Sequence, residues 1–280
     1  MTTDVAPPAR AGVAALRRLG TSLLTLVGSA VALGLAWLAF LELFDVTPYI
    51  GKTPVDVWDY LFTVPRAPEN RDVMFGGLLT TLGDAGIGFA AGLVAACVTA
   101  AIFVVVKPFE FAFMPIAMLL RSVPLVAMAP LLLLVFGRGV GGVAAIGGIV
   151  VFFPALVNVV LGLRSASPQS LDLIRVAGGS TWTALRKVAV PTALPHFFAA
   201  VRISVPGAMT GAMLAEWLAT NQGLGGEIFR SIAKASYSGV WTIVVLVTGA
   251  SILAYTLAGV VEALVLSRWG PDAGVTRARR

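Results

Sequence analysis

The segment from Arg164 to Pro195 has residue types and spacing that suit docking to a partner. Asp172 and Arg175 lie three positions apart, so in a helix they share a face and can form an ion pair. Gly178-Gly179 follows and is expected to end that helix, because glycine readily adopts the left-handed conformation that closes a helix. The chemistry offered by this segment is non-covalent: it presents a charged surface to another molecule.

Two short amphipathic helices are expected on either side of this glycine corner. Ser167-Pro168 predicts the start of the first, with serine as N-cap and proline in the first turn, and Ser180 can cap the second. Pro191 and Pro195 are expected to stop the second helix. Its apolar face is expected to consist of Trp182, Leu185 and Val188 or Ala189. From this pattern alone, the pair could equally rest on lipid headgroups.

Polar residues at membrane depth form a second candidate group. Burying a polar side chain in lipid is costly, so a polar residue found there is a candidate for a function. Glu216, Trp217 and Asn221 are expected toward the outer half of a helix, about 20 Å along it from Arg202. They either line the outer gate of a transport path or hold local structure near the membrane surface.

Arg121 and Pro124 form a third group. Pro124 and Pro130 would interrupt an apolar helix and free backbone carbonyls toward a pore or a neighbouring helix. Arg121 either attracts an anionic substrate or extends its charge to the inner membrane surface.

These residues must be positioned by helices that cross a membrane. Hydrophobic residues make up 58% of the chain and charged residues 12%, about half the charged share of an average soluble domain. The charges are separated by long apolar windows, and about 20 apolar residues cross the hydrocarbon core as a helix. The sequence therefore predicts an all-α polytopic membrane protein with about six transmembrane helices.

The apolar windows also give the expected boundaries. We expect a cytoplasmic tail over 1–18, an extra transmembrane helix over 19–43, an extracytoplasmic loop over 44–76 and a cytoplasmic tail over 267–280. Further transmembrane helices are expected at about 80–106, 111–136, 140–163, 197–220 and 240–266, with a cytoplasmic connection over 164–195. Within the outer loop, Thr53-Pro54 predicts a short capped helix, and residues 221–239 are either outer or re-entrant.

The net charge of +6 is interpreted as membrane topology rather than nucleic-acid binding, since basic residues accumulate in cytoplasmic loops. Placing both termini in the cytoplasm puts most basic residues inside. Cys97 is the only cysteine and His196 the only histidine, which excludes an intrachain disulfide and disfavours a metal site. Neither a metal nor a cofactor is expected.

The spacing around Gly178 resembles the EAA signature of ABC-importer permeases. Val188 and Pro191 follow Gly178 as they do in that signature, and Asp172 occupies its acidic position. Further segments resemble the nitrate/sulfonate/taurine branch of these permeases: Val123-Pro124 through Pro130, Phe152-Phe153-Pro154, Ala215-Glu216-Trp217 and Gly223-Leu224-Gly225. Asp172 stands where the signature usually has Glu.

This resemblance implies a MetI-like permease domain over about 77–266 in a bacterial inner-membrane importer. It implies contact with a cytoplasmic ABC ATPase dimer through Asp172, Arg175, Gly178, Gly179, Val188 and Pro191. It also implies a partner binding protein outside and a second permease subunit; the branch resemblance favours a second copy of this chain over a different permease. The third predicted helix would border the path, which makes Met128 a candidate gate residue.

No G-x-x-x-x-G-K-[ST] phosphate loop occurs in the sequence, so ATP hydrolysis is assigned to a separate chain and no enzyme activity is expected. Relatives of the branch import nitrate, sulfonates, taurine or vitamin precursors. A small anionic or heteroaromatic solute is therefore expected. The alternative is a secondary transporter or channel without an ATPase, which predicts paired intramembrane charges or broken-helix repeats.

Overall fold

The computed structural model describes residues 28–29 and 31–269, and within these residues every regular element is a helix. The chain divides into two compact units, Met1–Ala67 and Pro68–Arg280. The expected tail over 1–18 and the start of the helix expected over 19–43 lie outside the described residues, as does most of the tail over 267–280.

The first unit contains an apolar helix, Val31–Leu43, and the short helix α2, Pro54–Phe62. Thr53 caps α2: its hydroxyl accepts a hydrogen bond from the Asp56 N–H at 3.2 Å. The Asp56 carboxylate in turn accepts from the Thr53 N–H at 2.8 Å and from its hydroxyl at 2.7 Å. This reciprocal capping confirms the short helix expected in the outer loop.

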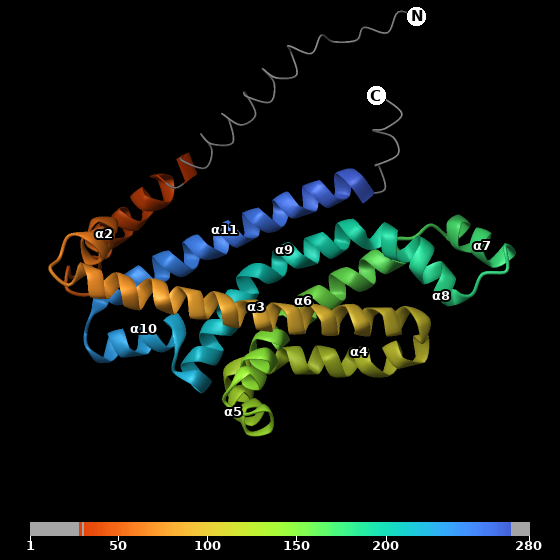
Figure 1. The fold of residues 1–280 in the computed structure, drawn as a ribbon, viewed down its shortest axis with the longest axis horizontal. Helices are drawn as coiled ribbons and strands as arrows, with labels where there is room; N and C mark the ends of the chain where they lie inside the picture. The colour runs from red at the N-terminus through yellow and green to blue at the C-terminus, as the bar shows by residue number, and fades with distance from the viewer. Residues whose placement is uncertain (1–27, 30, 270–280) are drawn as a thin grey trace, which may run out of the picture. The chain divides into compact units, whose positions relative to one another are not determined.

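In the second unit, long helices alternate with shorter ones (Figure 1). The elements in chain order are α3 Ala67–Val105, α4 Lys107–Ser122, α5 Leu125–Phe136, α6 Val140–Arg164, α7 Pro168–Val176, α8 Thr181–Ala184, the π-helix η1 Leu185–Ala189, α9 Val190–Ala215, the π-helix η2 Glu216–Thr220, α10 Gly223–Ala233 and α11 Tyr237–Trp269. Four described helices are long and apolar enough to cross a membrane: Ala67–Val105, Val140–Arg164, Thr181–Thr220 and Tyr237–Trp269. The all-helical membrane fold is confirmed.

Helix α6 lies at the centre of the packing in this unit. A Cβ added at Gly88 of α3 would lie 2.8 Å from the Gly147 Cα of α6, and one added at Gly211 of α9 would lie 2.9 Å from the same atom. Glycine at these crossings lets three helix backbones approach closely, as is typical of helices packed in lipid.

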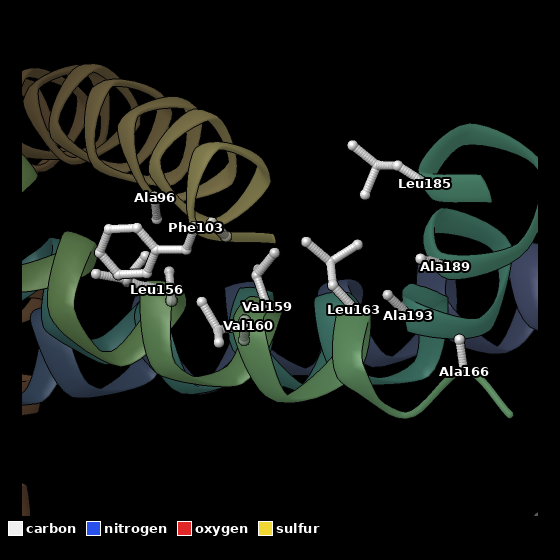
Figure 2. Close-up of a cluster of buried hydrophobic side chains, with 13 residues drawn as sticks. Ala96, Phe103, Leu156, Val159, Val160, Leu163, Ala166, Leu185, Ala189 and Ala193 are labelled. Carbon is white, nitrogen blue, oxygen red and sulfur yellow. The ribbon is translucent and has the colours of Figure 1, made fainter. Parts of the chain in front are cut away.

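A buried apolar cluster continues from this crossing toward the C-terminus of α6 (Figure 2). It joins Ala96 and Phe103 of α3, several residues of α6, and Leu185 and Ala189 of η1. The cluster therefore ties the end of the α6 span to the beginning of the Thr181–Thr220 helix.

Several helix boundaries differ from the expectation. Helix α3 begins at Ala67 rather than at about residue 80, and the helix expected from about residue 197 begins at Thr181. The helix expected over 111–136 is divided into α4 and α5, because Val123 takes an extended backbone (φ −80°, ψ 126°) before Pro124, whose ring disfavours a helical residue in front of it. The expected stops at Pro191 and Pro195 are wrong, because the helix continues through both. Directly before Pro191, the Val190 N–H bonds to the Leu185 carbonyl across the wider π-turn, and the missing N–H of each proline removes one backbone hydrogen bond.

Candidate functional site

The segment after α6 forms the helix–corner–helix element expected from the sequence. The Ser167 hydroxyl accepts from the Ser170 N–H at 3.3 Å, and the Ser180 hydroxyl accepts from the Thr183 N–H at 3.3 Å. Gly178 lies at the corner with φ +78°, in the region that favours glycine. A Cβ at Gly179 would lie 2.9 Å from the Ile174 carbonyl oxygen, so both glycines are required by the turn.

Apolar side chains on both helices of this element are exposed. Leu173 is 69% exposed, Val176 88% and Trp182 62%. Beside them, Asp172 and Arg175 form an ion pair at 3.0 Å. Of the apolar face expected for the second helix, Leu185 and Ala189 are buried, whereas Trp182 is exposed, because the face that joins the core begins only at η1.

The structure brings five of the six expected coupling residues into one continuous segment. Asp172 and Arg175 lie on α7, Gly178 and Gly179 form the corner, and Val188 lies in η1. The sixth, Pro191, lies in the first turn of α9. Thr181–Thr220 is one helix of 40 residues, so the helix–corner–helix element over 164–195 is continuous with a helix long and apolar enough to cross a membrane.

Glu216 marks the opposite end of that helix and is fully buried. Its Oε2 accepts from the Gly225 N–H at 2.7 Å and from the Thr81 hydroxyl at 3.0 Å. The Thr81 oxygen accepts from the Leu224 N–H at 2.9 Å. Because these amides are in the first turn of α10, Glu216 and Thr81 together cap that helix from two different spans.

The glycines of the Gly223-Leu224-Gly225 motif are explained by this cap. Gly223 has φ +60°, and a Cβ there would overlap the Glu216 carboxylate. A Cβ at Gly225 would lie 2.9 Å from the Glu216 Cβ. The α10 backbone can therefore approach the carboxylate only with glycine at both positions.

Trp217 and Asn221 do not join the Glu216 cap. Trp217 is 49% exposed. Asn221 has a left-handed backbone with φ 53°, and its carbonyl accepts from Arg230 Nη1 at 2.7 Å. The three residues grouped by sequence thus divide into one buried capping residue and two exposed neighbours.

Pro124 and Met128 border a cavity of about 350 Å³ at the break between α4 and α5. Ser122 is the only polar residue among those that line it; the lining residues are Leu120, Ser122, Val123, Pro124, Leu125, Met128, Ile149, Val150, Phe153 and Pro154. The backbone of Arg121 lies in α4, whereas its side chain lies outside the described residues.

Sequence reasoning missed three contacts between distant residues. No local sequence pattern links Thr81 to Glu216. The side chain of Gln222, the residue before α10, makes no capping hydrogen bond, so α10 must be capped by residues from elsewhere in the chain. Arg202 of α9 and Glu262 of α11 form an ion pair at 3.1 Å, and the Arg202 guanidinium lies 5.6 Å from the centroid of the Tyr255 ring. The third contact, between Glu110 of α4 and Arg164 of α6, is also an ion pair.

Comparison with known proteins places this arrangement in a family. The model of the binding-protein-dependent transport system inner membrane component matches residues 88–267. These residues include the helix–corner–helix element, Glu216 with the first turn of α10, and the four long helices in whole or in part, whereas Thr81 lies before the match. The chain belongs to this family. Its members are transport permeases, and the resemblance found in the sequence is confirmed.

Several curated relatives are permeases of small solutes. The riboflavin transport system permease of Chloroflexus aurantiacus is 35% identical over 57% of this chain and 59% of its own length. The formylaminopyrimidine transport permease of Halalkalibacterium halodurans is 28% identical over 78% of this chain and 86% of its own. A putative aliphatic sulfonates transport permease of Bacillus subtilis is 28% identical over 54% and 55%, respectively.

These similarities confirm the functional class: the chain is a membrane permease of the ATP-driven import type for a small solute. The family works with ATPase and binding-protein partners in general. A secondary transporter or channel is not favoured, although Arg202 and Glu262 are the kind of paired charges that it predicts. That pair holds α9 against α11, and both residues lie within residues 88–267, which match the permease family.

Proposed function

We propose that two copies of this chain form the membrane path of an ABC importer, driven by an ATPase dimer that docks on residues 164–195. The observation that carries the proposal is the exposed apolar face of Leu173, Val176 and Trp182 beside the Asp172–Arg175 ion pair. Exposed apolar patches with a charged border are typical of protein interfaces. No described element of the chain covers this face.

The proposed orientation places both termini and the docking element in the cytoplasm and α10 at the outer side. Figure 1 shows α7 and α8 at one end of the second unit and α10 at the other. The basic residues Arg164, Arg175, Arg186 and Lys187 gather at the docking end, which supports a cytoplasmic location for it.

Alternating access follows from the helix that links the two ends. Closure of the ATPases around ATP displaces α7 and α8, and Thr181–Thr220 carries this displacement across the membrane. The far end of the helix bears Glu216, whose carboxylate caps α10. Movement of the docking element would therefore shift α10 at the side where a loaded binding protein delivers its solute.

The proposed cargo is a small heteroaromatic or anionic solute. The cavity at the α4–α5 break, with Met128 and Phe153 among its apolar walls, suits a planar ring that packs against apolar and aromatic groups. Relatives are named for riboflavin, formylaminopyrimidine and aliphatic sulfonates, which agrees with both classes. Met128 is proposed as a gate residue of this path.

The docking proposal is tested by co-purifying the permease with its partner ATPase. Leu173→Glu and Val176→Glu place a carboxylate on the exposed face, where it is solvated in the free permease but buried without a partner in the complex. We expect ATPase recovery to fall about ten-fold or more, because burying an unpaired charge costs several kcal/mol. Val55→Glu, a change at a residue that is 67% exposed in α2, is the matched control and should leave recovery unchanged.

The outcome that would overturn the proposal is full ATPase recovery with both docking-face variants. Solute uptake by membranes that contain the permease but no ATPase would instead favour the secondary transporter. Crosslinking between two differently tagged copies tests the homodimer separately.

A further inference from the structure

A cavity of about 830 Å³ lies where the first turns of α4 face the last turn of α6. The residues that line it are Lys107, Glu110, Phe111, Met114, Pro115 and Arg164. It is separate from the cavity at the α4–α5 break and shares no lining residue with it. The proposed solute path therefore does not account for this cavity.

The polar residues of this cavity leave an excess of positive charge. Arg164 donates to Glu110 through Nη2, and the Glu110 side chain is only 15% exposed whereas that of Arg164 is 52% exposed. A guanidinium has five N–H donors, so the carboxylate orients Arg164 and leaves donors for a second acceptor. Lys107 forms no ion pair with any described residue, which gives the cavity a net positive charge.

An apolar stripe runs away from Lys107 along α4. Phe111, Pro115 and Leu119 follow at four-residue spacing and therefore share its helix face. Phe111 is 80% exposed and Leu119 70%, so this face is not packed against the described part of the chain. A basic group at the end of an exposed apolar stripe matches a molecule with an anionic head and a hydrocarbon tail.

We propose that this cavity binds an anionic phospholipid of the inner leaflet. Arg164 and Lys107 hold the phosphate, and the acyl chain lies along Phe111 and Pro115. Basic pockets between transmembrane helices on the cytoplasmic side are suited to such headgroups. The inference rests on the proposed orientation, which puts the end of α6 at the cytoplasmic surface.

The site has a consequence for coupling, because Arg164 is the last residue of α6 and α7 begins at Pro168. A phosphate held by Arg164 would fix the point from which the docking element extends. The bound lipid is thus expected to restrict the motion of α7, the first helix of the segment on which the ATPase acts.

The test uses the purified full-length permease without ATPase or binding protein. Native mass spectrometry measures the affinity for phosphatidylglycerol, with phosphatidylcholine and inorganic phosphate as comparison ligands. We expect selective binding of phosphatidylglycerol, and we expect Lys107→Gln to weaken it about five-fold, since a basic residue near an anionic lipid surface contributes about that factor. Arg268→Gln, at an exposed basic residue in the last turn of α11, is the control and should bind like the unchanged protein.

Arg164 requires a paired change, because its loss alone would leave the Glu110 carboxylate without a partner. The double variant Glu110→Gln/Arg164→Gln removes both charges together, keeps a neutral hydrogen bond and leaves the net charge of the cavity unchanged. It is expected to weaken phosphatidylglycerol binding about five-fold through the loss of a guanidinium hydrogen bond to the phosphate. Equal binding of phosphatidylcholine, or equal weakening by Arg268→Gln, would overturn the proposal. Full competition by inorganic phosphate would also overturn it, by assigning the cavity to small anions.

Failure of this inference can be told apart from failure of the proposed function. Lipid binding is measured without the ATPase, and ATPase recovery is measured with docking-face variants that do not touch the cavity. Lys107→Gln should retain ATPase recovery within about two-fold, because Lys107 is not part of the docking face.

Discussion

Replacing Glu216 tests whether this buried carboxylate holds α10 in place. Glu216→Ala removes the acceptor of the Gly225 N–H and of the Thr81 hydroxyl. Hydrogen bonds to a charged group are each worth about 1.5–3 kcal/mol, and the alanine variant no longer buries a carboxylate, which offsets part of the loss. We therefore expect the opening free energy of the first turn of α10 to fall by about 2–4 kcal/mol.

Amide hydrogen exchange of the permease in lipid nanodiscs measures this opening. A loss of about 2–4 kcal/mol corresponds to roughly 30- to 1,000-fold faster exchange in the first turn of α10. Glu216→Gln keeps a carbonyl acceptor for Gly225 and should accelerate exchange by less than about ten-fold. Trp217→Ala changes the exposed neighbour and should leave α10 unaffected.

The reasoning is refuted if Glu216→Ala leaves exchange in α10 unchanged, since the carboxylate would then not be its cap. It is also refuted if the glutamine variant is as severe as the alanine variant. That result would mean that negative charge, rather than the acceptor geometry shown by the structure, is what matters at this position.

Two further predictions concern α2 and the α3–α6 crossing. Hydrogen bonds from Thr53, chiefly from its hydroxyl and secondly from its N–H, lower the pKa of Asp56. The cap is therefore complete above the ordinary aspartate pKa of about 3.9, and it is lost as the pH falls through the lowered pKa. Thr53→Ala should cost α2 about 1 kcal/mol at pH 7 and reduce this acid sensitivity in hydrogen exchange without removing it, because the backbone N–H of residue 53 still donates to Asp56; Thr63→Ala should do neither. Gly88→Val should abolish the folded permease peak in size-exclusion chromatography, because the added Cβ alone would lie 2.8 Å from the Gly147 Cα. The control Gly83→Val should be tolerated, since nothing lies within 4 Å of a Cβ at that position. A normal yield of the Gly88 variant would contradict the close crossing.

Local patterns in the sequence were sufficient for the features that depend on neighbouring residues. Long charge-free windows predict the apolar spans, because the hydrocarbon core demands a minimum helix length. Ser167, Gly178 and Ser180 predict the docking element, since caps and left-handed corners are set by the residues that form them. Thr53 and Asp56 predict α2 for the same reason.

Features that depend on distant residues were not predictable in this way. Glu216 and Thr81 lie 135 positions apart, and neither residue alone reveals that both cap α10. The helix continues through Pro191 directly after the five-residue π-helix η1, whereas a proline in the sequence is by itself a general signal that a helix ends. The exposure of Trp182 follows from where η1 meets α6, a packing result that a short apolar pattern cannot fix.

The two π-helices explain how one helix can serve both the docking element and the α10 cap. η1 precedes α9 and η2 follows it directly, so the wider turns lie at the ends of the apolar span rather than within it. Such turns often accompany functional sites. At η1 the wider turn admits Pro191 without a break, and at η2 Glu216 is the first residue and bears the carboxylate that caps α10. Because the helix between them is unbroken and Arg202 ties it to Glu262 of α11, a push at α8 is expected to move α9 and α11 together, and α10 with them.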